Sequence, residues 1–341
     1  MVKILLKRGR ENAKGREHII LQKKLAEAMP LSTLSGRPVH IIYGTAWKKE
    51  RTAELVRSAV KAGFRAIDTA CQPKHYDEAQ VGVALEQLLQ EPQNGGAIRR
   101  EDIFVQTKFT SVDGQDPARV PYDRKASLPD QVRQSMARSL ANLRVDFVDS
   151  LVLHGPMRTL DENRLVWRTF EELHAAGKTK RIGLSNCYDL RLLRTLYDEA
   201  HIRPAVLQNR FHAETGHDRD IRAFCTQNGI VYQSFWTLNF QFYAKFVWVF
   251  LAKLNYVWKF WTANPHALHS TVIRDIAKKR GITPEQLFYR FTIDIGITPL
   301  SGTTNTAHMA HDVLVPDMPP LSAEEIGQIE SILYYGQGKK S

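Results

Sequence analysis

Apolar residues follow two alternating patterns along this chain: short strand-like runs and longer segments with helical spacing. Val39–Tyr43 is predicted as the first strand, and Thr52–Ala62, which Gly63 ends, as the first helix. The further strands are predicted at Phe64–Asp68, Ile103–Lys108, Phe147–His154, Arg181–Leu184, Ala205–Gln208, Ile230–Ser234 and Ile297–Leu300. The further helices are predicted at Glu78–Leu89, Asp130–Leu143, Arg164–Ala176, Leu190–Ala200, Asp218–Asn228, Ser270–Lys279, Pro284–Ile295 and Ala323–Leu333, with another near His308–Leu314.

This alternation of strand and helix repeats about eight times, and such a pattern is typical of a parallel sheet. The length of 341 residues favours a closed (β/α)8 TIM barrel over an open sheet. No G-x-G-x-x-G turn follows the first strand, which also disfavours an open dinucleotide-binding sheet. We therefore expect one α/β barrel at residues 38–335, a basic and poorly ordered extension at 1–37, and a short tail at 336–341.

Charge and cysteine content narrow the possible partners. The chain has 47 Lys and Arg against 36 Asp and Glu, which gives a formal charge of +11. Such a surplus suits nucleic acid, an anionic membrane or a phosphorylated cofactor. Much of it lies in the first forty residues, and no zinc finger, aromatic RNA motif or basic repeat supports nucleic acid. The scattered Cys71, Cys187 and Cys225 predict free thiols in a reducing compartment, and we expect a cytoplasmic protein.

The basic arm at residues 1–30 leaves an organelle-targeting role open. Mitochondrial arms avoid acidic residues, so Glu11, Glu17 and Glu27 count against that role. No long apolar core follows the positive start, and we expect no secretory signal.

The segment 239–261 differs in composition from the rest of the chain. It is dominated by aromatic and aliphatic residues with lysine and asparagine, and it contains no acid, glycine or proline. Lys245, Lys253 and Lys259 divide it, so no charge-free run approaches the ~18 residues of a membrane span. Three interpretations are open: a lid over the active face, an interfacial segment on a membrane, and a translated intron or gene-model error, which we favour.

Three predicted strands lead into polar residues that can carry chemistry. Asp68 ends one strand and is followed by a short loop to Tyr76, and two later strands end on Lys108 and His154. The carboxyl ends of the strands of a parallel barrel meet at one face, where active sites are built. A carboxylate, a phenol, an ammonium and an imidazole are therefore expected to meet there, although each of them alone could be a rim or packing residue.

Several motifs in this chain resemble the aldo-keto reductase family. In family order they are Asp68-Thr69-Ala70, Tyr76-Asp77-Glu78, Gln106-Thr107-Lys108, Leu153-His154-Gly155-Pro156, Gly183-Leu184-Ser185-Asn186 and Gln208. Gly302-Thr303-Thr304 followed by His308-Met309 is similar to a fungal or plant-like subfamily. The resemblance covers about residues 38–335. It implies reduction of an aldehyde or ketone by hydride transfer from NAD(P)H, with no metal.

The resemblance also implies a role for each polar residue of this face. Tyr76 is the expected proton donor, and because a phenol with a pKa of about 10 is a weak acid, the ammonium of Lys108 is expected to lower that pKa. Asp68 is expected to keep Lys108 charged and in position. His154 is expected to orient the carbonyl oxygen of the substrate.

The expected cofactor is NADPH, with NADH left open. Ser185, Asn186 and Gln208 are expected to hold the nicotinamide carboxamide, because a flat amide needs both donors and acceptors. The full set of expected cofactor-binding residues is Gly44, Thr45, Asp68, Ser185, Asn186, Gln208, Gln233, Ser234, Ser301, Gly302, Thr303 and Thr304.

Two features of the catalytic region depart from the family pattern. The gap between Asp68 and Tyr76 is longer than usual, which leaves His75 or a displaced Tyr76 as alternatives. The position of the ring that stacks on nicotinamide holds Gln233, with Phe235 or Trp236 as substitutes.

A third departure concerns the 2′-phosphate of NADPH. Residues 299–309 contain no Lys or Arg, the side chains best suited to bind a phosphate. The backbone at a helix N-terminus opened by Thr304 or Asn305 could still bind it.

The expected substrate is a small carbonyl compound whose identity the variable loops do not reveal. We expect a monomer with no nucleic-acid partner, and membrane contact only if 239–261 is a genuine exposed segment. A second hypothesis is a cofactor-binding barrel with little turnover that acts as a redox sensor or scaffold partner.

Overall fold

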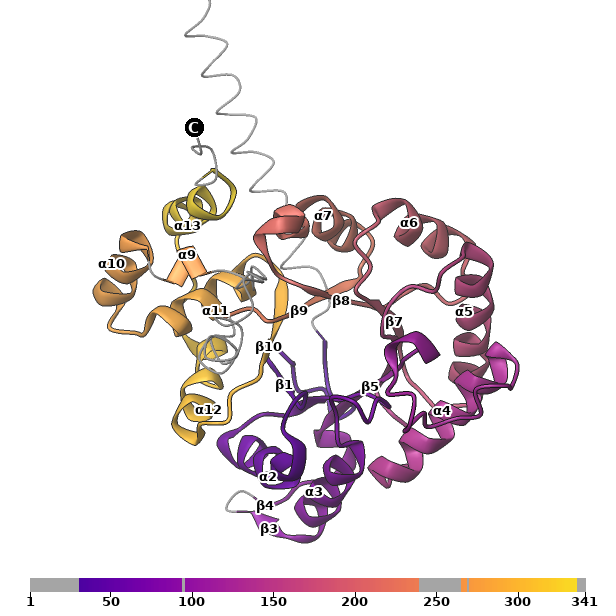
Figure 1. The fold of residues 1–341 in the computed structure, drawn as a ribbon. Coiled ribbons are helices and arrows are strands. Elements are labelled where there is room, and N and C mark those ends of the chain that lie inside the picture. Colours follow the sequence, from indigo (N-terminus) through magenta and orange to yellow (C-terminus); the bar gives the residue numbers. More distant parts are fainter. Residues whose placement is uncertain (1–30, 94–95, 239–264, 269, 336–341) are drawn as a thin grey trace, which may run out of the picture.

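The structure, a computed structural model, describes residues 31–93, 96–238, 265–268 and 270–335. Its parallel strands close into an eight-stranded barrel with helices around it (Figure 1). In barrel order the strands are β1 (Ile42–Gly44), β10 (Ile297–Ser301), β9 (Val231–Phe235), β8 (Val206–Arg210), β7 (Ile182–Ser185), β6 (Ser150–Leu153), β5 (Phe104–Phe109) and β2 (Ala66–Asp68). The prediction of a (β/α)8 TIM barrel is confirmed.

The helices follow the strands in the predicted order. They are α2 (Thr52–Ala62), α3 (Glu78–Gln90), α4 (Leu128–Leu143), α5 (Leu160–Ala175), α6 (Leu190–Glu199), α7 (Arg219–Gln227), α9 (Pro265–Leu268), α10 (Thr271–Arg280), α11 (Pro284–Asp294), α12 (Thr306–Asp312) and α13 (Ala323–Tyr335). Short 3-10 turns lie at Lys49–Arg51, Arg100–Asp102, Val112–Gly114, Ala213–Asp218 and Val315–Asp317. None of the helices in the described ranges combines the length and apolar character needed to cross a membrane.

A small antiparallel sheet outside the barrel was not predicted. Its strands β3 (Pro92–Gln93) and β4 (Gly96–Ala97) flank a sequence rich in proline, glycine and asparagine, which is typical of a loop. Residues 1–30 of the expected extension, the segment 239–261 and the tail at 336–341 lie outside the described residues.

The prediction that residues 1–37 are poorly ordered is wrong for residues 31–37. Ser32 and Pro38 form an antiparallel bridge, and the side chain of Leu31 is only 2% exposed. Leu31 and Val39 pack in one cluster with Phe104 and other interior residues at the start of the strands. These two apolar side chains are buried because the amino-terminal end of the barrel interior would otherwise be open to water.

Polarity changes abruptly along the barrel interior. Ala66, Phe104 and Val206 begin their strands in the apolar interior cluster. Side chains alternate between the two faces of a strand, so the residues two positions later point into the same interior. Those residues are Asp68, Gln106 and Gln208. An apolar layer therefore lies beneath a polar layer at the carboxyl ends of the strands.

Two helical glycines give a matched test of this packing. A Cβ on Gly82 in α3 would lie 1.9 Å from the carbonyl oxygen of Asn142, at the end of α4, whereas one on Gly327 in α13 would meet nothing within 4 Å. Gly82→Ala should lower the unfolding free energy by about 1–3 kcal/mol or more through overpacking. Gly327→Ala should raise it by about 0.5–1 kcal/mol through helix propensity. Urea unfolding checks both, and a shift in the same direction for the two variants would contradict this packing.

Candidate active site

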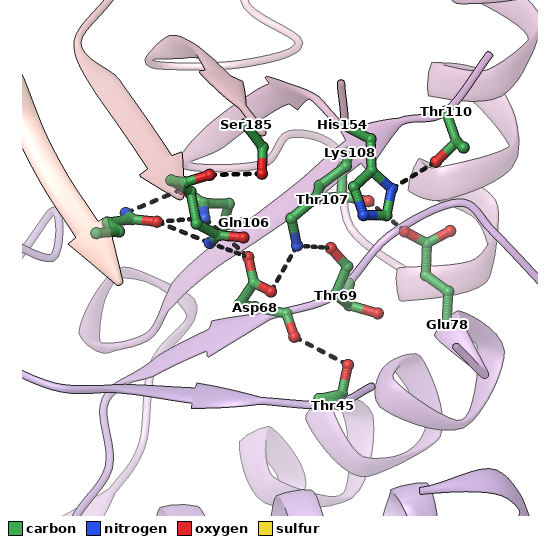
Figure 2. A network of polar contacts seen from close by, with 12 residues as sticks. Thr45, Asp68, Thr69, Glu78, Gln106, Thr107, Lys108, Thr110, His154 and Ser185 are labelled. Atoms are coloured by element: carbon green, nitrogen blue, oxygen red, sulfur yellow. Dashed lines mark hydrogen bonds and ion pairs between the residues drawn. The ribbon is translucent and has the colours of Figure 1, made fainter. Parts of the chain in front are cut away.

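A buried ion pair lies at the centre of the polar layer. Asp68 ends β2 and is 2% exposed, and Lys108 on β5 is 1% exposed. The Lys108 ammonium donates to Asp68 Oδ2 at 2.5 Å and to the Thr69 carbonyl oxygen at 2.9 Å (Figure 2). Burial lowers the pKa of Lys108 below its ordinary value, and the Asp68 carboxylate opposes that effect. An ammonium has three N–H donors, so one of them has no partner among the described residues.

Two glutamines bind the other oxygen of this carboxylate, and a third glutamine binds those two. Asp68 Oδ1 accepts hydrogen bonds from Gln106 Nε2 at 2.8 Å and Gln208 Nε2 at 3.0 Å. Gln233 Oε1 accepts from the same two amides at 2.7 and 2.9 Å. Gln233 is therefore a fully buried member of this layer, and its amide lies between two others. The expectation that Gln233 takes the stacking position against nicotinamide is not supported by these contacts.

The backbone of Asp68 is also held from the neighbouring strand. Gly44 pairs with Asp68 in the barrel, and both the backbone N–H and the hydroxyl of Thr45 donate to the Asp68 carbonyl oxygen, at 3.0 and 2.9 Å. Gly44 and Thr45 were predicted to bind the cofactor. In the structure their contacts position the backbone of Asp68, and the Thr45 hydroxyl is used for that purpose.

The loop after β2 delivers Tyr76 to the ion pair. The backbone N–H groups of His75 and Tyr76 both donate to the Gln72 carbonyl oxygen at 3.1 Å. This tight turn places the Tyr76 ring centre 5.3 Å from Lys108 Nζ and 5.9 Å from the ring centre of His154. His75 instead stacks on Trp47, with ring centres 3.9 Å apart. Of the two alternatives that the long gap left open, the structure brings Tyr76 to Lys108.

The pKa of Tyr76 moves in the opposite direction from the one expected. Burial raises it well above the ordinary value, and the charge of Asp68 raises it further. The expected lowering is wrong here because the hydrogen bonds of Lys108 go to Asp68 and Thr69, and none of the described residues donates to the phenol oxygen. The phenol therefore keeps its proton at neutral pH.

His154 follows β6 as a neutral imidazole. Burial, and then the charge of Lys108, lower its pKa to about 3. The hydroxyl of Thr110 and His154 Nδ1 lie 2.7 Å apart in a hydrogen bond, which fixes the orientation of the ring (Figure 2). The Asn186 side chain donates to the His154 carbonyl oxygen at 2.7 Å. Across ordinary pH the ring can therefore donate or accept a hydrogen bond without adding a charge.

The side-chain donors of the predicted carboxamide-binding residues are engaged in hydrogen bonds within the protein. Ser185 Oγ donates to the Gln208 carbonyl oxygen at 2.6 Å, Asn186 donates to His154, and the Gln208 amide donates into the layer. Gln208 Oε1, in contrast, accepts nothing from the described residues. The side-chain oxygens of Gln208 and Asn186 can thus accept hydrogen bonds from the N–H groups of a carboxamide, whereas their side-chain N–H groups are already engaged.

The predicted phosphate region follows β10. The hydroxyls of Ser234 and Ser301 are each in 2.7 Å hydrogen bonds, with Thr237 and Asp312 respectively, and are buried. Two N–H groups at the start of α12 are occupied as well, because Asn305 Oδ1 accepts from Ala307 and His308. A phosphate bound by the backbone at this helix would therefore have to use other N–H groups than these two.

A cation that sequence reasoning missed lies at the same loop. Lys48, which is 7% exposed, donates through Nζ to the carbonyl oxygen of Gly302. Tyr43 donates to the Thr303 carbonyl oxygen at 3.0 Å, while Gly302 and Thr304 are exposed. Because β1 pairs with β10 when the barrel closes, the loop after β1 lies next to the loop after β10. The position of Lys48 could have been predicted from this strand pairing.

The described residues hold no group of three or more His, Cys, Asp or Glu side chains arranged to bind a metal ion. The three cysteines are buried and free of disulfides, as the sequence predicts.

The buried ion pair can be tested by its effect on stability. Asp68→Asn should lower the unfolding free energy by about 3–5 kcal/mol, because it leaves the Lys108 charge buried without its partner. The double variant Asp68→Asn with Lys108→Met should recover most of that loss, since both charges are gone. Urea unfolding at pH 7 measures both, and a double variant no more stable than Asp68→Asn would show that the pair is not coupled in this way.

Comparison with known proteins places this chain in a family. The sequence model described as the Aldo/keto reductase family matches residues 40–334. Methylglyoxal reductase DkgA of Escherichia coli K12 is 26% identical over 291 residues, which cover 85% of this chain and 86% of that protein. Aldo-keto reductase family 4 member C11 of Arabidopsis thaliana is 28% identical over 292 residues, which cover 81% of each.

Solved structures show the same architecture. The aldo/keto reductase of Brucella melitensis aligns with a TM-score of 0.66 and 24% identity, over 89% of this chain and 99% of that one. An aldo-keto reductase complexed with NADPH (AKR2E5) aligns with a TM-score of 0.66 and 22% identity, over 89% and 87%. A family match over almost the whole barrel, on a fold shared with solved members, shows that this chain belongs to the aldo/keto reductase family of NAD(P)H-dependent oxidoreductases.

Proposed function

We propose that the protein reduces an aldehyde or ketone to the alcohol with NADPH, and that Tyr76 gives the proton to the carbonyl oxygen. The observation that supports this most directly is the Lys108 ammonium, which Asp68 holds in place 5.3 Å from the Tyr76 ring centre. When bound, NADPH supplies the hydride, and the protein supplies position, charge and the proton.

Tyr76 and Lys108 divide the proton transfer between them. The raised pKa of Tyr76 keeps the phenol protonated until the carbonyl oxygen becomes basic. As the proton leaves, negative charge develops on the phenol oxygen, and the third N–H of Lys108 is available to stabilise it. This stabilisation grows with the charge, so it favours the transition state over the ground state.

Asp68 and His154 prepare the site for this step. Asp68 preserves the charge on Lys108 against the cost of burial. His154, which is neutral and held by Thr110, can donate one hydrogen bond to the carbonyl oxygen and orient it. The proton therefore comes from Tyr76 and not from an imidazolium.

The residues present fit a nicotinamide dinucleotide, provided that Lys48 takes the place of a cation within residues 299–309. Gln208 Oε1 and Asn186 Oδ1 would accept from the carboxamide, and Ser185 would support them by holding the Gln208 backbone. Toward the phosphates, Lys48, which contacts the Gly302–Thr304 loop, would supply the positive charge that residues 299–309 lack. Lys48 is the basis on which we propose NADPH in preference to NADH.

A relative bears on the substrate class. DkgA carries the name methylglyoxal reductase, which describes a small aldehyde substrate for that protein. We extend only the class to this chain, a small carbonyl compound. The alternative of a cofactor-binding barrel with little turnover is not favoured, because the proton donor and its cation are assembled next to each other.

Tyr76→Phe tests the proton donor. We expect kcat for carbonyl-dependent NADPH oxidation to fall by at least ~100-fold, the usual contribution of one general acid. NADPH affinity, followed by tryptophan fluorescence, should stay within about 2-fold, because no hydrogen bond to the cofactor is assigned to the phenol. Tyr197→Phe on α6 is the matched control, because among the described residues its hydroxyl is hydrogen-bonded to Arg203 alone. An unchanged rate in Tyr76→Phe would remove Tyr76 from its role.

Lys48→Met tests the proposed phosphate cation. The Kd for NADPH should rise by about 10-fold or more, the scale of one hydrogen bond to a charged group, and the Kd for NADH should rise less. Lys49→Met, a change of the exposed neighbouring lysine, should leave both values unchanged. Fluorescence titration gives the four constants. An equal loss for both cofactors would contradict the preference for NADPH.

The same lysine predicts a pH dependence. Burial and the charge of Arg51 lower the pKa of Lys48 to about 8, and the Tyr43 ring lies 5.6 Å from its ammonium. Above pH 8 the free protein loses this positive charge, so NADPH binding should weaken as pH rises from 8 to 9.5 in the wild type. In Lys48→Met that part of the pH dependence should be absent, and an identical profile in both proteins would exclude Lys48 as its source.

A further inference from the structure

Arg210, the last residue of β8, has a guanidinium that makes no hydrogen bond to the described residues. Its Cζ lies 4.0 Å from the Trp236 ring centre and 5.9 Å from that of Phe235. Its Nε is buried and has no partner, and none of the described residues pairs with the rest of the group. Only the backbone N–H of Arg210 donates, to the Tyr188 hydroxyl at 3.1 Å. The half-buried cation thus lies against aromatic rings, and its N–H groups have no hydrogen-bond partner among the described residues.

Three other buried or partly buried arginines of the described chain have a carboxylate partner, although the Nε atoms of Arg100 and Arg290 are also buried without a hydrogen bond. Arg100 pairs with Asp149 at 2.8 Å, Arg280 with Glu325 at 2.6 Å, and Arg290 with Asp294 at 2.5 Å. Leaving a guanidinium edge unpaired away from water costs free energy, and proteins normally avoid it. Arg210, in contrast, has no carboxylate partner among the described residues, so its guanidinium is available to an anionic ligand.

Strand alternation places Arg210 at the mouth of the barrel. Val206 packs in the apolar interior cluster, and Gln208, two positions later, reaches Asp68 in the polar layer. Arg210 follows by two more positions on the same face, one step closer to the carboxyl ends of the strands. Its partner across β9 is Phe235, just beyond the Gln208–Gln233 pair.

A short chain of contacts joins Arg210 to the candidate catalytic residues. The Tyr188 hydroxyl, which accepts from the Arg210 backbone, donates to Asn186 Oδ1 at 3.4 Å. Asn186 in turn donates to the His154 carbonyl oxygen at 2.7 Å. Arg210 therefore belongs to the same rim as His154, across β6, β7 and β8.

We propose that Arg210 binds the carboxylate of the carbonyl substrate, which makes oxo acids and aldehydes that carry a carboxylate the preferred substrate class. This rests on the proposed reductase function and specifies its substrate. A guanidinium edge offers paired N–H donors that match the two oxygens of a carboxylate, and stacking on Trp236 holds that edge in one orientation. A phosphate of the cofactor presents similar anionic oxygens, so the experiment must separate the two sources.

The test compares matched substrates in the wild type, Arg210→Met and Arg210→Lys. The pairs are succinic semialdehyde with butanal, and the isomeric carboxybenzaldehydes with benzaldehyde. For each pair the ratio of kcat/KM, carboxylated over neutral, should fall by about 10- to 100-fold in Arg210→Met. Arg210→Lys should restore part of it, because the charge returns without the planar fork. Arg203→Met, which removes an exposed arginine stacked on Tyr197, should leave the ratio unchanged.

Two binding measurements distinguish the possible failures. Benzoate should bind the complex with NADP+ at least about 10-fold more weakly in Arg210→Met, a readout that needs no turnover. The Kd for NADPH should change by less than about 2-fold. An unchanged substrate ratio with a weakened NADPH complex would assign Arg210 to the cofactor phosphates and overturn the proposal. A wild type that binds benzoate through Arg210 but reduces no carbonyl would sustain this site and reject the reductase function.

Discussion

The buried contact between Asp68 and Lys108 is the constraint on which the rest of the site depends. Two opposite charges, each almost fully removed from water, are costly unless their hydrogen bonds are satisfied. Here Gln106 and Gln208 satisfy one oxygen of the acid, and Lys108 satisfies the other. The ammonium consequently has a fixed position, and it lies beside Tyr76, the proposed proton donor.

The barrel creates this arrangement by a simple rule of alternation. Interior positions near the strand starts are apolar, and the next interior positions along β2, β5 and β8 are Asp68, Gln106 and Gln208. The apolar layer beneath excludes water from the ion pair, which strengthens its electrostatics. One interior therefore serves both as a hydrophobic core and as the floor of the site.

Much of the fold could be predicted from the sequence because its signals are local. The helix Thr52–Ala62 has the predicted bounds, since helical spacing precedes a glycine that ends it. Asp68, Lys108 and His154 stand at or just beyond strand ends, so a parallel barrel brings them to one face. The pairing of Asp68 with Lys108 then follows from charge.

The remaining features depend on contacts that join distant parts of the chain. The Gln106–Gln233 and Lys48–Gly302 hydrogen bonds join strands and loops that meet only when the barrel closes, and no local sequence pattern predicts them. The direction of the Tyr76 pKa depends on where the N–H donors of Lys108 point, which spacing does not encode. The burial of Leu31 likewise depends on the open end of the finished barrel.

The charge on Lys108 is the most direct test of the account. The side-chain 13Cε signal of Lys108, assigned by its disappearance in Lys108→Met, can be followed by NMR from pH 6 to pH 9 in the free protein. The account predicts the chemical shift of an ammonium at pH 7, because Asp68 offsets the cost of burial. A neutral amine at pH 7 would contradict it, since Tyr76 would then have no cation to stabilise the charge left by its proton.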